Sequence, residues 1–339
     1  MKAAVWTGIN KVEIKEVPIP EIGSEEALLK VRCAGVCVTD FHIISGKLKI
    51  GKMPNIQGHE ICAEVAKINS KNSDIKIGQR CVVKTSLGCG ECEYCRSGKQ
   101  YLCKNSSEIG YYPHNGGYAE YLKVPVSQIV PIPDSVSDYA ASIMESCVCP
   151  TESLMNFKVP FNGDVIVFGA GPAGLAYIML SKLMGARRVI SVVRQNKFDR
   201  AYSFGADIVI DSSKDIVKEV EKITNGEFCE LVIEATGNAS IISMTPNVCK
   251  KGGRIIQYGI PGDDEVVNYP VKKLIVDEIT IHGAVGNTKA WYPLIDLIDQ
   301  GKLNLEKLVT HEFKLEDINK AFDLYRNHDS SLIKAVIKF

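Results

Sequence analysis

Four cysteines close together have the spacing of a structural zinc site. Cys89, Cys92, Cys95 and Cys103 form a C-x2-C-x2-C-x7-C pattern, and four thiolates in a tetrahedron are typical ligands of a closed Zn²⁺ site. Disulfides or buried thiols are the alternatives, but charged residues separate the first three cysteines. Because the N-terminal residues lack the apolar core of a signal peptide, the spacing predicts a zinc ion that stabilises a loop.

Two further segments carry the residue types of a catalytic metal site. One contains Cys37, Thr39 and His42, and the other is the pair His59–Glu60. Cysteine, histidine and carboxylate are ligands of catalytic zinc, which keeps one coordination position open for water or substrate. Taken singly, Cys37 is more typical of a buried thiol, and His59–Glu60 of a hydrogen-bonded core pair. Their occurrence together, upstream of the four cysteines, favours a metal site.

The elements around these segments predict an α/β protein with two domains. Residues 1–80 consist of short strand-like segments interrupted by proline and glycine, a pattern typical of a β-barrel. A chain of 339 residues is long enough for a second domain, and the composition changes near residue 160. We expect a catalytic domain over residues 1–155, completed by residues 290–339, and a nucleotide-binding domain over residues 156–289.

The second domain carries a dinucleotide-binding pattern. The apolar strand segment Val165–Phe168 precedes Gly169-Ala170-Gly171-Pro172-Ala173-Gly174, and a helical segment follows over residues 175–184. In such a unit the first glycine makes the turn, the second admits the pyrophosphate, and the third lets helix and strand pack closely. Five further strand segments predict a doubly wound parallel sheet, with the pyrophosphate at the helix N-terminus.

The end of the second strand in this domain indicates which nicotinamide cofactor binds. An acidic residue there would bind the ribose 2′-hydroxyl of NAD, but Val193 occupies this position and Arg194 follows. Without the carboxylate a 2′-phosphate is not repelled, and a guanidinium can bind it bidentately, with Ser191 and Lys197 assisting. The alternative is that Arg194 is a solvated cation and that NAD binds. We favour NADP(H).

Together these motifs resemble those of the zinc-dependent medium-chain dehydrogenase/reductase (alcohol dehydrogenase) family, in its polyol, sorbitol and threonine dehydrogenase-like branch. The matching segments follow the order of the family over nearly the whole chain: G-V-C-V-T-D at 35–40, G-H-E at 58–60, the four cysteines, N-G-G-Y-A-E-Y at 115–121, M-E at 144–145 and G-A-G-P-A-G at 169–174. The resemblance implies a GroES-like β-barrel catalytic domain, which the C-terminal segment rejoins, and a Rossmann domain.

The resemblance also implies the ligands of the catalytic zinc. Cys37 and His59 would bind the ion, and Glu60 would lie next to the metal and exchange with water. Glu145 would be the third ligand, although Cys147 is an alternative because alcohol-type relatives use a cysteine there. We favour Glu145 and expect two zinc ions per chain, one catalytic and one structural.

The implied reaction transfers a hydride between an alcohol and the nicotinamide ring. Zinc would make the bound hydroxyl a stronger acid, Thr39 would hydrogen-bond the alkoxide, and His42 would relay the proton. Four residues of the second domain would contact the ribose and nicotinamide by their position in the family: Thr236, Gly237, Ala284 and Val285.

Composition limits the possible partners. Forty basic residues balance forty acidic ones, so nothing indicates a nucleic acid or an anionic membrane as partner. We expect a cytoplasmic homo-oligomer, a dimer or tetramer, that acts on a small secondary alcohol: a polyol, sugar acid or hydroxy-amino acid. The alternatives are an enzyme for simple alcohols, a zinc-free quinone-type reductase, or a non-catalytic NADPH- or zinc-binding relative.

Overall fold

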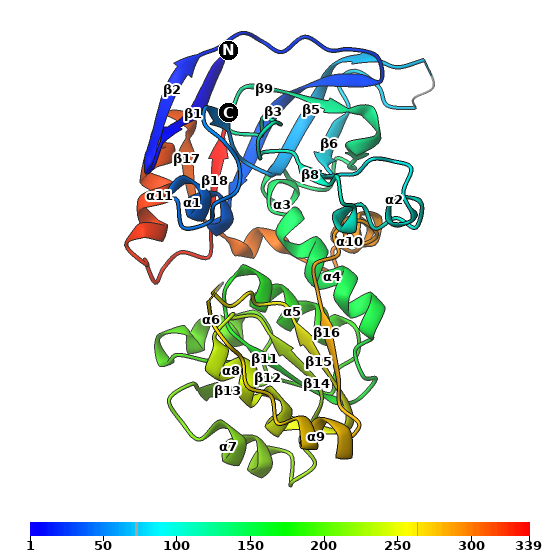
Figure 1. Cartoon of the computed structure of the whole chain (residues 1–339), viewed down its shortest axis with the longest axis vertical. Helices are drawn as coiled ribbons and strands as arrows, with labels where there is room; N and C mark the ends of the chain where they lie inside the picture. The colour runs from blue at the N-terminus through cyan, green and yellow to red at the C-terminus, as the bar shows by residue number, and fades with distance from the viewer. Residues whose placement is uncertain (72–73, 263) are drawn as a thin grey trace. The chain divides into compact units, whose positions relative to one another are not determined.

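The computed structural model describes residues 1–71, 74–262 and 264–339 and divides into two compact units (Figure 1). Unit 1 comprises Met1–Val148 and Asn287–Phe339, and unit 2 comprises Cys149–Gly286. The first crossing between the units lies within helix α4 (Glu145–Phe157).

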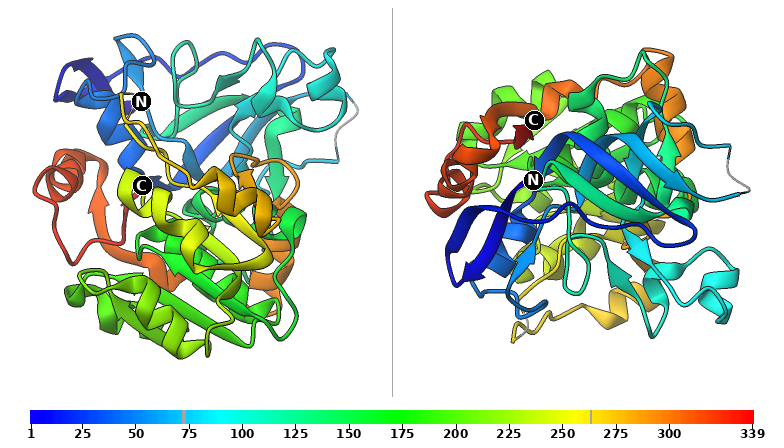
Figure 2. Two further views of the ribbon diagram at one scale, coloured as in Figure 1. Left: turned by 60° about the horizontal axis from the view of Figure 1, so that its bottom comes forward. Right: turned by 90° about the horizontal axis from the view of Figure 1, so that it is seen from above.

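Unit 1 is built on a sheet that the last strand of the chain completes. The long strand β3 (Glu26–Val36) pairs antiparallel with β5 (Glu60–Asn69), and β18 (Lys334–Lys338) lies on its other side, with Val336 opposite Gly35. Figure 2 shows the blue N-terminal strands and the red C-terminal strand within this one unit. The other strands of the sheet are β6 (Arg80–Val83), β9 (Tyr121–Pro125), β10 (Ile129–Pro131) and β17 (Val309–Lys314).

A second, three-stranded sheet shares the apolar core of unit 1. It has the strand order β2-β1-β4, and an isolated antiparallel bridge joins Ala3 of β1 to Ala119, which lies just before strand β9 of the larger sheet. Trp6 and Leu29, from different sheets, and Phe322 of a C-terminal helix belong to one buried cluster. The elements are β1 (Lys2–Gly8), β2 (Lys11–Glu16), β4 (Asn55–Ile56) and helix α11 (Ile318–Arg326).

Short elements complete unit 1 and carry most of its polar motifs. Two-residue strands pair next to the four cysteines, and short helices lie between the strands. These elements are α1 (Val38–Ile44), β7 (Ser86–Leu87), α2 (Glu93–Arg96), β8 (Ser107–Glu108), α3 (Asp138–Ser142), α10 (Trp291–Asp299) and 3-10 turns at Gln100–Leu102, Val126–Gln128, Leu305–Leu308 and Leu315–Asp317.

Unit 2 contains a six-stranded, wholly parallel sheet with the order β13-β12-β11-β14-β15-β16. Every residue of the central strand β11 (Asp164–Phe168) is buried, as expected for a strand covered on both faces. The order reverses between β11 and β14, and ligands of such sheets bind at the carboxyl ends of the strands at this point. The other strands are β12 (Arg188–Val193), β13 (Ile208–Asp211), β14 (Cys229–Glu234), β15 (Cys249–Gln257) and β16 (Thr280–Gly283).

Helices cover this sheet, and three of them contribute to the apolar cluster that includes Ile166 and Phe168. These three are α7 (Ile216–Ile223), α8 (Ala239–Met244) and α9 (Val271–Val276). The remaining elements are α5 (Pro172–Leu183), α6 (Phe198–Ser203) and 3-10 turns at Gln195–Lys197 and Thr245–Val248. The predicted fold class, an α/β protein with a β domain and a doubly wound parallel sheet, is confirmed. No helix among the described residues has both the length and the apolar character needed to cross a bilayer.

Candidate functional site

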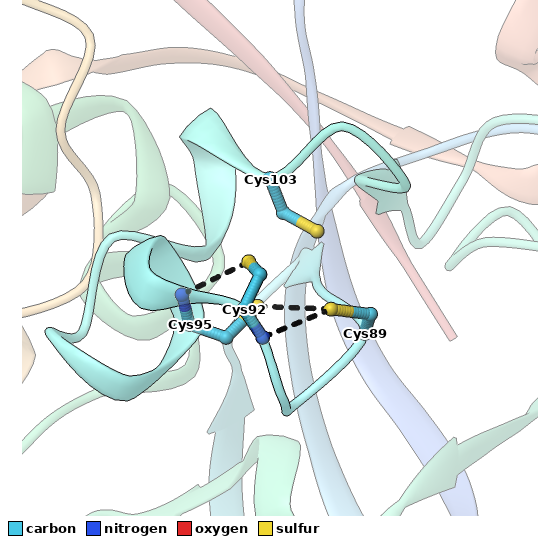
Figure 3. Close-up of side chains that lie close together, drawn as sticks. All are labelled: Cys89, Cys92, Cys95 and Cys103. Atoms are coloured by element: carbon cyan, nitrogen blue, oxygen red, sulfur yellow. Dashed lines mark hydrogen bonds between the residues drawn. The ribbon is translucent and has the colours of Figure 1, made fainter.

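The four cysteines of the C-x2-C-x2-C-x7-C pattern come together in one loop of unit 1 (Figure 3). Their sulfur atoms all lie within 4.8 Å of one another. The N–H of Cys92 donates to Sγ of Cys89 at 3.4 Å, and the N–H of Cys95 donates to Sγ of Cys92 at 3.5 Å. A Cβ atom on Gly88 would lie 2.5 Å from Sγ of Cys95, so only glycine allows this approach.

The chemistry of this donor set suits zinc. The backbone N–H groups of Glu91 and Cys92 lower the pKa of the Cys89 thiol to about 6, and none of the described cysteines forms a disulfide. Four sulfur donors that close around one point match a structural Zn²⁺ site and not an oxygen-seeking cation such as Ca²⁺ or Mg²⁺.

A second cluster in unit 1 unites the two polar segments of the barrel. Ligand atoms of Cys37, His59 and Glu60 lie within 4.8 Å of one another. Cys37 is the N-cap of α1, and Glu60 is the first residue of β5. Cys37 and Glu60, 23 positions apart in the sequence, therefore converge at the end of the β3–β5 pair, where Gly35 stands opposite Glu60.

Two glycines make this convergence possible. A side chain on Gly35 would overlap the carboxylate of Glu60. Gly58 has a φ of +99°, and a Cβ there would lie 2.8 Å from the ring of Tyr118. The glycines of the motifs at 35–40 and 58–60 thus allow backbone and side chains to pack where any Cβ would collide.

Asp40 holds the histidine of this cluster, a role that the sequence did not reveal. Its Oδ1 lies 3.1 Å from Nδ1 of His59, and its Oδ2 accepts from the hydroxyl of Tyr118 at 2.7 Å. Burial opposes the charged form of both partners, but their pairing holds the pKa of Asp40 below its ordinary value and, together with Tyr111, raises that of His59. A histidine that directs Nδ1 at a carboxylate leaves Nε2 for a metal.

Glu60 forms a buried ion pair and keeps one oxygen free. Its Oε1 accepts from Nζ of Lys334, and the two side chains are 0% and 2% exposed. Its Oε2 is buried and has no hydrogen-bond partner among the described residues. An unpartnered buried acceptor beside a thiol and an imidazole fits a metal ion.

Of the two candidates for the third ligand, neither belongs to the group of ligand atoms within 4.8 Å. Burial raises the pKa of Glu145 to about 7; the charge of His59 opposes this rise and the charge of Glu60 adds to it, so Glu145 interacts electrostatically with the cluster. Burial raises the pKa of Cys147 to about 12, which disfavours a thiolate there. The choice of Glu145 stays a prediction.

The predicted proton-handling residues follow Cys37 on helix α1. The Cys37 thiol donates to Oγ1 of Thr39 at 3.5 Å, which brings this hydroxyl to the cluster. His42 lies in the last turn of α1 and is partly buried. Burial and the charge of Lys47 lower the pKa of the His42 ring.

The glycine-rich turn of unit 2 has the geometry of a dinucleotide site. Gly169 has a φ of +103°, and a Cβ on Gly174 would overlap the carbonyl oxygen of Gly169, so the turn and the close packing both require glycine. Helix α5 begins at Pro172 and has no side chain capping its N-terminus. A Cβ on Gly171 would meet nothing within 4 Å, which leaves space for an anion beside Ala173 and the helix N-terminus.

Several cationic side chains follow the end of β12, and two of them have no carboxylate partner among the described residues. Among the described residues, Arg194 and Lys197 form no ion pair with an acidic side chain. Burial, followed by the charges of Arg200 and Arg194, lowers the pKa of Lys197. Ser191 differs from expectation, because it is completely buried within the sheet and its hydroxyl is closed to a ligand in this conformation.

The remaining predicted cofactor residues lie on loops that follow β14 and β16. Thr236 and Gly237 both donate to the carboxylate of Glu234. The N–H of Ala284 donates to the carbonyl of Gln257 at 3.0 Å, and the side chain of Val285 is largely exposed.

Comparison with known proteins identifies relatives of the whole chain. The family model described as "Alcohol dehydrogenase GroES-like domain" matches residues 23–134, and "Zinc-binding dehydrogenase" matches residues 172–300. An L-threonine 3-dehydrogenase from Rhizobium rhizogenes is 30% identical over 327 residues, which cover 94% of this chain and 93% of that protein.

Solved structures agree over the full length. A zinc-binding dehydrogenase from Sinorhizobium meliloti 1021 bound to NADP has a TM-score of 0.90 at 27% identity and covers 100% of this chain and 99% of its own. A short chain alcohol dehydrogenase from E. coli CFT073 complexed with NADH has a TM-score of 0.93 at 27% identity, with the same coverage of both chains.

Proposed function

Since the chain belongs to the zinc-dependent medium-chain dehydrogenase/reductase family, we propose that it interconverts a small polyol, sugar acid or hydroxy-amino acid and its ketone. The membership that the motifs predicted is confirmed, as is the class of activity, a zinc-dependent, NAD(P)-linked oxidoreductase acting on a secondary alcohol. The observation that carries the proposal is the cluster of Cys37, His59 and Glu60 with its unpartnered carboxylate oxygen.

Residues of unit 1 would hold the catalytic zinc, and each has a separate task. Cys37, His59 and Glu145 would be the ligands, and Glu60 would lie next to the ion. When bound, zinc supplies Lewis-acid polarisation of the substrate oxygen. Asp40 would fix the ring of His59 by accepting from Nδ1, and such partners commonly control metal affinity.

Thr39 and His42 would handle the proton of the substrate alcohol. The Thr39 hydroxyl, which lies next to Cys37, would hydrogen-bond the substrate oxygen. The lowered pKa of His42 keeps its ring neutral at pH 7 and able to accept a proton. We expect that His42→Ala slows alcohol oxidation at neutral pH and that a higher pH partly restores the rate; kinetics unchanged at every pH would remove His42 from the relay.

L-Threonine is the first substrate to test, because the L-threonine 3-dehydrogenase of Rhizobium rhizogenes resembles this chain over nearly its whole length. Simple alcohols are the second candidate, supported by the full-length likeness to an alcohol dehydrogenase. A panel of polyols, sugar acids, hydroxy-amino acids and simple alcohols, each tested with both nicotinamide cofactors, separates the two. Turnover of primary alcohols alone would contradict the proposed substrate class.

NADP(H) is the proposed cofactor, and Arg194 with Lys197 would bind its 2′-phosphate. Support comes from the missing acidic residue at Val193 and from two cations that no described carboxylate neutralises. Arg200 adds positive charge next to Lys197. The ratio of kcat/KM for NADP⁺ to that for NAD⁺ tests the assignment: Arg194→Ala should lower the ratio about tenfold or more, the size of one charged hydrogen bond, and a wild-type preference for NAD⁺ would overturn it.

Two zinc ions per chain are proposed, one in each cluster of unit 1. Elemental analysis of the purified protein should give a ratio near two, and His59→Ala should remove one ion only. A ratio of one or zero in the active wild-type enzyme would contradict the two-site assignment.

A homo-oligomer in the cytoplasm is also proposed. Strand β16 is the edge of the parallel sheet, and the side chains of Val271, Ile275 and Val276 on the preceding helix α9 are 60–71% exposed. An open strand edge beside exposed apolar side chains suits pairing with a second copy of the chain. The chain has twelve cysteines, and none of the described ones forms a disulfide, which suits a reducing compartment. Light scattering that gives a monomer mass would refute the oligomer.

A further inference from the structure

A buried carboxylate without a cationic partner lies at the carboxyl end of strand β14. Glu234 is the last residue of this strand and is 0% exposed. Among the described residues, no lysine, arginine or histidine forms an ion pair with it. Burying a carboxylate is costly unless hydrogen bonds or a cation satisfy it. Hydrogen bonds must therefore stabilise the buried carboxylate of Glu234.

Neutral donors from the loop after β14 and from the last residue of β15 satisfy this carboxylate. The N–H of Thr236 donates to Oε1 at 2.7 Å, its hydroxyl donates to the same atom, and the N–H of Gly237 follows at 3.2 Å. The side-chain amide of Gln257, at the end of β15, donates to Oε2 at 2.8 Å. Hydrogen bonds to a carboxylate are stronger than those between neutral groups. Glu234 therefore ties the loop after β14 to the end of the next strand.

The backbone around Glu234 strengthens the same connection. The N–H groups of Tyr258 and Gly259 both donate to the backbone carbonyl of Glu234 at 3.0 Å. A Cβ on Gly259 would overlap the N–H of Gly237 and would lie 2.5 Å from Oε2 of Glu234. The loops after β14 and β15 are thus packed against one carboxylate with no room for a side chain between them.

The loop that Glu234 holds borders the glycine-rich turn. The N–H of Ala235 donates to the carbonyl of Phe168 at 3.1 Å, and a Cβ on Gly169 would lie 3.1 Å from Cγ2 of Thr236. Further along, the hydroxyl of Thr236 accepts from the N–H of Asn238 at 3.1 Å, and Asn238 caps helix α8. The carboxylate thereby sets the course of the chain from the strand end to the next helix.

We propose that Glu234 is a positioning residue for dinucleotide binding, which fixes the Thr236–Asn238 loop for the ribose–nicotinamide half of the cofactor. This inference rests on the proposed function, because it takes the switch point between β11 and β14 as the cofactor site. A preformed loop lowers the entropy lost when the ligand orders it, so loosening the loop weakens binding without removing a direct contact.

Glu234→Gln tests this inference with the full-length, zinc-loaded protein. Glutamine keeps the size of the side chain but has one acceptor oxygen, and its NH2 group would face the amide donor of Gln257. We expect the Kd for NADPH and for NADH, measured by fluorescence titration, to rise about tenfold or more. The Kd for 2′,5′-ADP, which lacks the nicotinamide half, should change less than twofold, and amide exchange of Gly237 should become faster.

Glu227→Gln is the matched control, since Glu227 is an exposed glutamate shortly before β14 and should leave both affinities unchanged. Equal NADPH affinity of Glu234→Gln and wild type would overturn the proposal, and so would an equal loss for NADPH and 2′,5′-ADP, which would indicate general damage to the sheet. If Glu234→Gln does not fold, Gln257→Met keeps the carboxylate and removes the amide that donates to it, together with the bonds of that amide to Gly259 and Tyr269. This variant should raise the Kd for NADPH about threefold or more; no change would again overturn the proposal. A wild-type protein that binds no dinucleotide would instead refute the proposed function.

Discussion

Replacing Lys334 by methionine tests how the buried charges of the catalytic cluster are compensated. Lys334 and Glu60 form an ion pair in which both side chains are buried, at 2% and 0% exposure. Burial alone would lower the pKa of Lys334, but the charges of Glu60 and Cys37 raise it above its ordinary value. Methionine has a similar length and no charge, so the change leaves the carboxylate of Glu60 without its counter-charge.

The size of the effect follows from the burial. Removing one partner of a fully buried ion pair destabilises a protein by about 3–5 kcal/mol, because the other charge stays buried. For a unit of this size that corresponds to a fall in its unfolding midpoint of about 6–20 °C. With zinc bound beside the orphaned Oε2 of Glu60, the ion supplies positive charge, and the loss should be smaller.

Calorimetry of the chelator-treated and the zinc-loaded protein measures both effects. Lys67→Met is the matched control, since Lys67 is exposed on strand β5 and should shift the midpoint by less than about 2 °C. A Lys334→Met variant as stable as this control would show that the pair contributes nothing. An equal loss with and without zinc would refute the idea that the ion and Lys334 neutralise the same carboxylate.

Three further predictions, with four variants, test other parts of the structure. Gly171→Ala should leave the unfolding midpoint unchanged and raise the Kd for the dinucleotide about tenfold or more. Gly174→Ala should lower both stability and affinity, because its Cβ would collide with the Gly169 carbonyl. Titration and calorimetry measure both quantities, and the same changes in the two variants would contradict this prediction. Cys103→Ser should lower the zinc content from two ions to one per chain, and an unchanged content would exclude the four-cysteine site. Burial opposes ionisation of Asp164, but two arginines hold its pKa below the ordinary value. The resulting stability is present above about pH 4 and is lost as the pH falls further. Asp164→Asn should therefore be less stable at pH 7, and its stability should change less between pH 5 and pH 3 than that of the wild type; the same pH dependence in both proteins would refute this.

What the sequence predicted was local in the chain. The zinc loop and the glycine turn depend on spacings of two to seven residues, and such short spacings can be read from the sequence whatever the order of the strands. The strand pattern predicted a parallel sheet for the same reason, since a wholly apolar run such as Val165–Phe168 suits a strand buried on both faces.

What the sequence did not predict depends on strand order. Lys334 meets Glu60 across 274 positions because β18 lies beside β3, and no local signal marks that pairing. Asp40 was visible next to Thr39, but only the meeting with His59 and Tyr118 gives it a role. Ser191 was predicted to assist in binding a 2′-phosphate, but strand β12 buries its side chain within the sheet, which its position in the sequence does not show.

The charges of the catalytic cluster argue for a divalent ion more directly than any single ligand does. Cys37 and Glu60 of the cluster, with the buried Glu145 outside it, supply up to three negative charges, and Asp40 adds a fourth. The buried ammonium group of Lys334 compensates part of this negative charge, and His59 contributes a positive charge only while both of its ring nitrogens are protonated. Without a metal, the surplus is relieved by protonation, which is the direction in which burial moves the pKa of Glu145. A divalent cation removes the need for those protons, so this cluster should bind metal with release of protons and more tightly as the pH rises.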